Sequence, residues 1–334
     1  MVSPFLTPLV VPSFSSRGFP QERQNLQEVT RNHFVDFAGF FDALLVSAFD
    51  LHFGYVRATD IPAGCTVFVD SGGYEAREWE DDSATHLKQL PHAHEDWTPE
   101  LMARTIAGLP DESRFIYVNL DSDTALAHQV ATATAQLSGF RQAKRSFLLK
   151  EEPVSHGSAV KCPIADTIAA LPSVIAELAS FDVIGITEKS LGSSYHERLG
   201  NLQLLCALLC KFGLKLPVHV FGALDPLTVR AYVLAGASIF DGLTWIRFAY
   251  RDGQCVYLSN DILSESDFDA DFTEGRNAVF ARNYGQLVQL QDELRHYVQS
   301  GDPAQLVLNE PVRAKIQLSL NRGRESELYR RLIG

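Results

Sequence analysis

Short apolar runs alternate with longer amphipathic segments along most of this chain, and the alternation limits the folds it can adopt. Seven runs have the length and composition of buried parallel strands: Ala43–Ala48, Thr66–Val69, Phe115–Leu120, Ser146–Leu149, Asp182–Thr187, Val218–Phe221 and Ser238–Phe240. Helical patterns lie between several of them, at Pro99–Ala107, Thr124–Ser138, Ile164–Ala179, Leu199–Phe212 and Pro226–Leu234. Strands that alternate with such helices form βαβ units and a parallel sheet. Seven or eight units over roughly 250 residues predict an α/β fold, a (β/α)8 TIM-like barrel.

The same rhythm suggests how the chain is divided. With 334 residues and 46% hydrophobic content, the chain can bury a barrel-sized core. The βα pattern stops after Asp252, so we expect residues 1–255 to form a catalytic barrel and residues 256–334 a C-terminal, mostly helical extension. Residues 75–97 are long, charged and follow a predicted strand directly, which predicts an inserted loop over the barrel mouth.

Charge and cysteine usage narrow the classes of function. The formal net charge of −12 argues against a purely electrostatic nucleic-acid binder. Five scattered cysteines indicate reduced thiols and a cytoplasmic protein, and Cys206 and Cys210 are both expected to face a helix-packed core. No run is long enough to span a bilayer, and the proline-bearing amino terminus is not that of a signal peptide. Residues 311–334 carry six basic side chains, which predict either a phosphate contact or an ordinary charged helix face.

Two carboxylates are expected at the carboxyl ends of two strands. The stretch 217–247 predicts a strand, a helix and a second strand that ends at Asp241, and a strand over Thr66–Val69 is followed by Asp70 and two glycines. In parallel α/β proteins ligands bind at this edge of the sheet. Two such carboxylates suggest a nucleophile paired with an acid/base, although an aspartate after a strand is also a common helix cap or turn former.

These two stretches resemble a known family. Residues His219 to Arg247 are similar, without a gap, to a segment of the tRNA-guanine transglycosylases, which exchange guanine for 7-deazaguanines; the similarity includes Gly222, Pro226, Gly236, Phe240, Asp241 and Arg247. Residues 70–74, Asp-Ser-Gly-Gly-Tyr, are similar to the family's second signature, Asp-Ser-Gly-Gly followed by an aromatic residue.

The resemblance implies a role for each carboxylate. Asp241 would attack C1′ of a guanosine and form a covalent glycosyl-aspartate. Asp70 would be the acid/base that helps guanine to leave and then deprotonates the incoming base. Glycosidic bonds break through an oxocarbenium-like state, which one carboxylate can trap while another moves the proton.

The resemblance also implies a base pocket. Tyr74 would stack on the base in place of a phenylalanine, while Ser71, Gly72 and Gly73 would let the backbone approach it. Asp121 would accept hydrogen bonds from the N1 and N2 edge of a guanine-type base, with Asp123 a close competitor for that role. The remaining substrate-binding candidates are Gly222, Arg247 and, more weakly, Glu188 and Lys150.

The departures from the family are informative. The transglycosylases carry a zinc site of three cysteines and a histidine after the nucleophile, where this chain offers only Cys255 and His296. We therefore expect no metal and no cofactor, and favour DNA over tRNA as the acceptor. Glu75 stands where a glutamine is typical. The expected partners are guanine or a 7-deazaguanine, a nucleic acid and a helper protein that unstacks the target base; no membrane partner is expected, and the oligomeric state is open.

Two alternatives belong to other classes of function. An acidic barrel without the zinc region also suits a glycosyl transferase or hydrolase acting on free nucleosides or nucleotides. A non-catalytic accessory subunit of a transglycosylase is the other alternative, although such a subunit could lose one aspartate and this chain keeps both.

Overall fold

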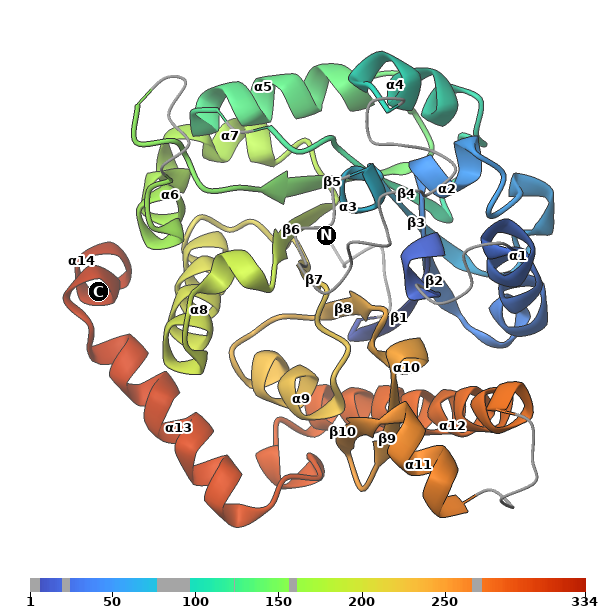
Figure 1. Ribbon diagram of the computed structural model, residues 1–334. Coiled ribbons are helices and arrows are strands. Elements are labelled where there is room, and N and C mark those ends of the chain that lie inside the picture. Colours follow the sequence, from blue (N-terminus) through green and yellow to red (C-terminus); the bar gives the residue numbers. More distant parts are fainter. Residues whose placement is uncertain (1–6, 20–24, 77–96, 123, 156–160, 266–271) are drawn as a thin grey trace.

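Eight parallel strands close into a barrel in chain order (Figure 1). The computed structural model describes residues 7–19, 25–76, 97–122, 124–155, 161–265 and 272–334. The strands are β1 (Leu9–Phe14), β2 (Ala43–Ser47), β3 (Thr66–Asp70), β4 (Phe115–Val118), β5 (Lys144–Leu149), β6 (Val183–Thr187), β7 (Val218–Phe221) and β8 (Ile239–Gly242). Strand β8 pairs with β1, with Val11 opposite Asp241, and so closes the ring. The chain is therefore a TIM-like (β/α)8 barrel, as its alternating pattern predicted.

Strand β1 was not among the predicted strands. It contains Pro12, and proline is disfavoured inside a sheet because it has no N–H to donate. Here Pro12 lies opposite Gly242 near the end of the strand, and every residue of β1 is buried. Pro12 is therefore the reason that the sequence pattern did not predict strand β1.

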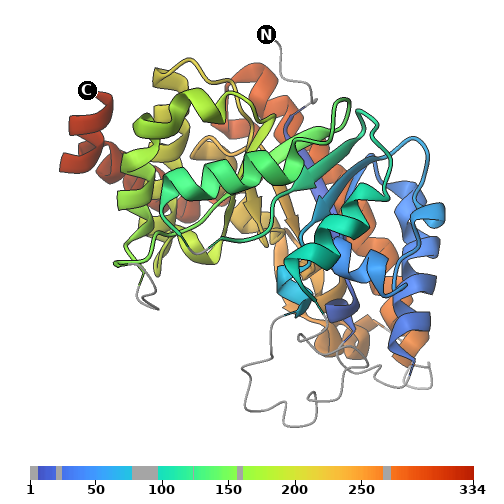
Figure 2. The ribbon, with the colours of Figure 1, turned by 90° about the horizontal axis from the view of Figure 1, so that it is seen from above.

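Helices surround the barrel and extend it at the carboxyl end (Figures 1 and 2). They are α1 (Leu26–Phe37), α2 (Ala48–His52), α3 (Gly73–Ala76), α4 (Pro99–Ala107), α5 (Leu126–Leu137), α6 (Ile164–Ala170), α7 (Ile175–Leu178), α8 (Tyr195–Lys211), α9 (Pro226–Leu234), α10 (Thr244–Arg247), α11 (Leu258–Glu265), α12 (Phe272–Ser300), α13 (Glu310–Glu325) and α14 (Glu327–Ile333). A hairpin of β9 (Phe248–Arg251) and β10 (Gln254–Tyr257) precedes α11.

Two predicted helices have different bounds for local reasons. Helix α8 begins four residues before the predicted Leu199, because Ser194 and Glu197 form a capping box at its start. The predicted helix Ile164–Ala179 is divided into α6, a 3-10 turn at Leu171–Val174 and α7. Pro172 lies at the division, where it cannot donate to an α-helical hydrogen bond.

The barrel interior is mostly apolar toward the amino ends of the strands and polar at their carboxyl ends. Successive strand residues face opposite sides, and the inward positions form one buried cluster of Leu9, Val11, Ala43, Leu45, Phe68, Ile116, Val118, Leu148, Val183, Phe221 and Ile239. Two residues after Val11, Phe68, Leu148 and Ile239, the inward positions are Ser13, Asp70, Lys150 and Asp241. The change from apolar to polar side chains makes the mouth the candidate site, since (β/α)8 barrels bind ligands at this end.

The C-terminal extension is bound to the barrel through buried contacts. Helix α12 joins the main core through Phe280, Leu287, Leu290 and Leu294. Its Gln291 donates to Pro8 O and accepts from Val10 N, at the start of β1. Helix α13 lies on α8, where a methyl group added at Gly323 would come within 3.2 Å of Gly200 Cα.

The two cysteines of α8 differ in exposure. Cys206 packs against the core, but Cys210 is exposed, so the prediction that both face a core holds only for Cys206.

Of the six basic residues in 311–334, Arg313 and Arg330 donate to backbone carbonyls of their own chain. Helices α13 and α14 lie away from α3 and α10 (Figures 1 and 2). Among the described residues, no helix is long and apolar enough to cross a membrane.

Candidate active site

Asp241 is held at the barrel mouth by three donors, which come from β1, from β7 and from the turn after β7. Its Oδ2 accepts a hydrogen bond of 2.7 Å from Ser13 Oγ on β1. Its Oδ1 lies 3.0 Å from His219 Nε2 on β7 and accepts from Gly222 N at 3.1 Å. The carboxylate is almost fully buried, so its orientation is fixed.

His219 completes this arrangement from inside the barrel. The ring is fully buried, stacks on Phe221 with a centroid distance of 3.8 Å, and meets Phe68 edge-on. Because a carboxylate oxygen accepts, this contact is a hydrogen bond when the His219 ring carries a hydrogen on Nε2. Its Nδ1 is buried and makes no hydrogen bond. His219 and Ser13 were not predicted as site residues; their signal is the two-residue alternation that places them inward beside Asp241.

Asp70 ends β3 and lies among other carboxylates. Burial, and then the charges of Glu75, Asp121 and Asp241, raise the pKa of Asp70 to about 7, although the backbone N–H of Ser71 acts in the opposite direction. Asp70 therefore tends to be protonated near neutral pH. A carboxyl group with a pKa near 7 can act as a general acid or base near neutral pH.

The turn after Asp70 brings the backbone close to the site. Gly72 has a φ of +82°, and a Cβ there would lie 2.6 Å from Phe49 Cβ, so only glycine fits. Gly73 N donates to Ser71 Oγ at 3.3 Å, and Trp97 Nε1 donates to Ser71 O at 3.1 Å. The predicted pair of glycines thus forms a tight turn between β3 and α3.

Asp121 and Lys150 form an ion pair beside this turn. Lys150 Nζ lies 2.8 Å from Asp121 Oδ2. A methyl group added at Gly73 would come within 3.9 Å of the same oxygen, which places the pair next to the glycine turn. Asp123, the competing candidate for base recognition, lies outside the described residues.

Tyr74 and two arginines form the rim of the mouth. Tyr74 is 44% exposed, and the Arg17 guanidinium lies over its ring, 5.1 Å from the centroid. Arg247 Nη2 donates to Tyr74 Oη at 3.1 Å and to Arg17 O at 2.9 Å. Arg17 was not predicted, because strand β1 and the loop after it were not recognised.

Glu75 is buried, and it lies in α3 rather than in a solvated loop. Ser15 Oγ donates to Glu75 Oε1 at 2.6 Å, and burial together with the charge of Asp50 raises the pKa of Glu75 to about 7. Asp50 is fully buried and accepts from both N and Oγ of Ser16. The predicted inserted loop, 75–97, lies outside the described residues between positions 77 and 96.

Glu188 is bound to side chains of helices α8 and α9. Its Oε1 accepts from Arg198 Nη1 at 3.0 Å and from Tyr232 Oη at 2.8 Å, so it connects α8 to α9. These bonds fit a structural role. Gly222, by contrast, contacts Asp241 directly through its N–H.

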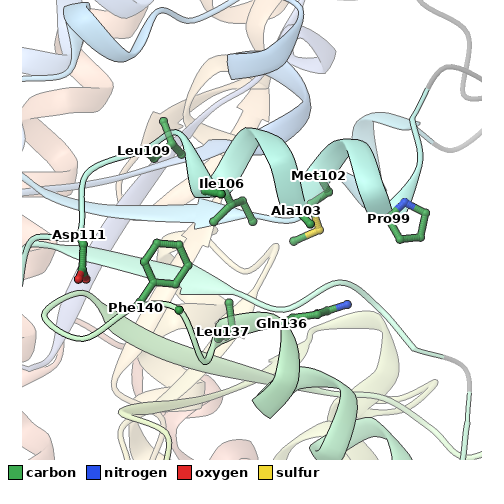
Figure 3. Close-up of a pocket in the computed structure, with 11 residues that line it drawn as sticks. Pro99, Met102, Ala103, Ile106, Leu109, Asp111, Gln136, Leu137 and Phe140 are labelled. Atoms are coloured by element: carbon green, nitrogen blue, oxygen red, sulfur yellow. The ribbon is translucent and has the colours of Figure 1, made fainter.

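A pocket lies on the outer wall of the barrel, where side chains of α4 and α5 such as Met102, Ile106 and Leu137 face one another (Figure 3). Its lining does not include Asp70 or Asp241. Within the described ranges no three His, Cys, Asp or Glu side chains gather as a metal site.

No protein-family model matches the chain, and no curated protein is significantly similar to it. The structure itself identifies the chain as a TIM-like (β/α)8 barrel with a C-terminal helical extension, which carries two carboxylates of its strand ends at the barrel mouth.

Proposed function

We propose that this protein exchanges guanine in a polynucleotide for a 7-deazaguanine, with Asp241 as nucleophile and Asp70 as acid/base. The observation that carries the proposal is the pairing of an Asp70 whose pKa is raised to about 7 with an Asp241 carboxylate held by three hydrogen bonds. The resemblance of residues 70–74 and 219–247 to the transglycosylases supports the same assignment.

In the first step the glycosidic bond of the target guanosine breaks. Asp241 Oδ2 accepts one hydrogen bond, from a hydroxyl that can rotate away, whereas Oδ1 has two nearby donors. We therefore assign the attack on C1′ to Oδ2. The C1′–N9 electron pair goes to the base, and Asp70 gives its proton to that base. Oδ1 becomes the ester carbonyl oxygen, held by Gly222 and His219.

In the second step the incoming base takes the place of guanine. Asp70, now ionised, removes the proton from N9 of the 7-deazaguanine, and N9 attacks C1′. The C1′–Oδ2 bond breaks, and its electron pair returns to the Asp241 carboxylate. Asp70 ends protonated, so the cycle consumes no net proton. The donors at Oδ1 stabilise the carboxylate as it leaves.

The rim of the mouth favours a phosphate-bearing acceptor. Arg247 donates to the hydroxyl group of the exposed Tyr74, and the buried Arg17 guanidinium lies over the Tyr74 ring. An aromatic ring beside guanidinium groups suits a flipped base with its phosphate, because base–aromatic stacking contributes roughly 1–3 kcal/mol per base. A polynucleotide supplies both groups.

A nucleoside-level exchange is the second candidate. It is favoured by the position of α13 and α14, whose basic residues lie away from the mouth and in part donate to their own chain. The same pair of carboxylates would serve that reaction, so the two candidates differ only in their acceptor.

Label transfer tests both candidates. Labelled guanine and labelled 7-cyano-7-deazaguanine are incubated with duplex DNA, single-stranded DNA, bulk tRNA and free guanosine. We expect label to enter a polymer with the wild-type chain and with Asp36→Asn, an exposed control, and not with Asp241→Asn. Label in guanosine alone would favour the nucleoside-level enzyme. Label in no acceptor would contradict base exchange by this chain on its own.

A further inference from the structure

The ion pair of Lys150 and Asp121 is fixed on two neighbouring strands at the mouth. Lys150 follows β5 and continues the inward series of Ser146 and Leu148. It is only 8% exposed. The side chain of Gln129 clamps its backbone, since Lys150 N donates to Gln129 Oε1 at 3.2 Å and Gln129 Nε2 donates to Lys150 O at 3.1 Å. Asp121 comes from the loop after β4, the adjacent strand.

Stability alone does not explain why a lysine is buried at this position. A buried ion pair seldom stabilises a protein more than apolar side chains of similar size, because both charges lose their hydration. The inward positions below Lys150 are Leu148 and Ser146, and neither is charged. A charged side chain at the top of this uncharged series indicates a ligand contact.

Resting on the function proposed above, we propose that Lys150 is the residue that selects a 6-oxo group on the base. An ammonium has three donors, and one ion pair uses one of them. The Asp121 carboxylate, which only accepts when ionised, has two oxygens and about four acceptor positions. The pair thus presents a donor beside an acceptor, separated by 2.8 Å.

Guanine and the 7-deazaguanines present the complementary edge. Their O6 accepts, and the neighbouring N1–H and 2-amino group donate. With N1 and the 2-amino group on Asp121, O6 faces Lys150 Nζ. A base without the 6-oxo group leaves the ammonium without its acceptor, which weakens binding strongly at a site built for that hydrogen bond.

Equilibrium binding of free bases tests the role of Lys150. Dissociation constants are measured by calorimetry with the full-length chain for guanine and for 6-thioguanine, which keeps N1–H and the 2-amino group and replaces O6 by sulfur, a weaker acceptor. We expect guanine to bind about 10-fold more tightly than 6-thioguanine. In Lys150→Met this ratio should fall close to one, and in Lys150→Gln, which keeps a neutral donor, it should fall only in part.

A second lysine of the same strand supplies the control. Lys144, at the amino end of β5, lies 3.5 Å from Asp182, so Lys144→Met removes a similar ion pair at the opposite end of the barrel. We expect it to leave the ratio unchanged. The role of Lys150 is overturned if Lys150→Met keeps the wild-type ratio, if Lys144→Met loses it equally, or if the wild-type chain binds no base.

The binding ratio and the exchange assay together distinguish the role of Lys150 from the proposed base exchange. Base discrimination that depends on Lys150, without any exchange into a nucleic acid or nucleoside, would contradict base exchange and leave the recognition role intact. Exchange with an unchanged ratio in Lys150→Met would contradict only the recognition role.

Discussion

Asp70 is the residue whose surroundings decide whether this mouth can do acid–base chemistry. Its carboxyl group lies near Glu75, Asp121 and Asp241, and burial adds to their effect, so its pKa is raised to about 7. A general acid works best when its pKa is close to the pH at which it operates. The same arrangement has a cost in stability, because ionising Asp70 in the folded chain is unfavourable.

The cost can be measured through the pH dependence of stability. The folded chain holds the Asp70 proton more tightly than the unfolded chain, whose pKa is near 3.8, so folding stability is lost as pH rises from 3.8 to about 7. We expect Asp70→Asn to leave Tm nearly unchanged at pH 3.5 and to raise it at pH 8. Calorimetric scans of both chains across this range test it, and a Tm gain that is independent of pH would contradict the raised pKa.

His219 is expected to position Asp241 without touching the substrate. His219→Leu removes the ring nitrogen 3.0 Å from Asp241 Oδ1, and we expect kcat for exchange to fall about 10- to 100-fold with little change in KM. His219→Gln, which keeps a donor, should recover part of the loss.

A second buried histidine is the matched control. His33 lies among Phe14, Phe37 and Trp245, and burial lowers its pKa to about 3. His33→Leu should leave kcat near the wild-type value. Equal losses in both variants would show that a buried ring matters only for packing.

At the scale of elements, the turn between β3 and α3 is the most constrained piece of backbone in the site. Gly72→Ala places a side chain at φ +82° and within 2.6 Å of Phe49 Cβ. We expect the free energy of unfolding to fall by about 1–3 kcal/mol from backbone strain, with the steric clash adding to it. Urea denaturation measures the change.

Gly64, which precedes the same strand, is the control for this turn. A Cβ at Gly64 would meet nothing within 4 Å, and its φ is not positive. Gly64→Ala should therefore be neutral or slightly stabilising. If Gly72→Ala were equally harmless, the close approach of this turn to Phe49 would not be a real constraint.

Sequence patterns predicted most strands and the position of both aspartates, because apolar runs ended by Asp70 and Asp241 are a local signal. They missed β1, because Pro12 breaks the pattern of a central strand. The loss of β1 also hid Ser13 and Arg17, which contact Asp241 and Tyr74. The ion pair of Lys150 could not be predicted, since its partner lies on another strand and no local pattern reports such contacts.

At the scale of the whole molecule, helix α12 completes the barrel. It lies beside β1 and α9 and contributes four side chains to the main core. Arg230 on α9 forms two hydrogen bonds of 2.7 and 2.8 Å with Glu293 on α12. The predicted boundary at residue 255 therefore separates segments that share one core.

Truncation tests this dependence. We expect a chain of residues 1–255 to lack cooperative unfolding, because it loses the α12 side chains of the core and the Gln291 contacts to β1. A chain of residues 1–309, which loses only α13 and α14, should keep a cooperative transition at a lower Tm. Near-ultraviolet circular dichroism during heating distinguishes them, and a cooperative 1–255 chain would show that the barrel folds alone.

Capture of the covalent intermediate tests the assignment of Asp241 most directly. The chain is incubated with guanine-containing DNA or tRNA without an incoming base, denatured, and separated by gel electrophoresis and mass spectrometry. We expect an adduct of polynucleotide and protein attached at Asp241, formed more slowly by Asp70→Asn and not at all by Asp241→Asn. An adduct that persists in Asp241→Asn, or base exchange without any adduct in the wild-type chain, would contradict the proposed mechanism.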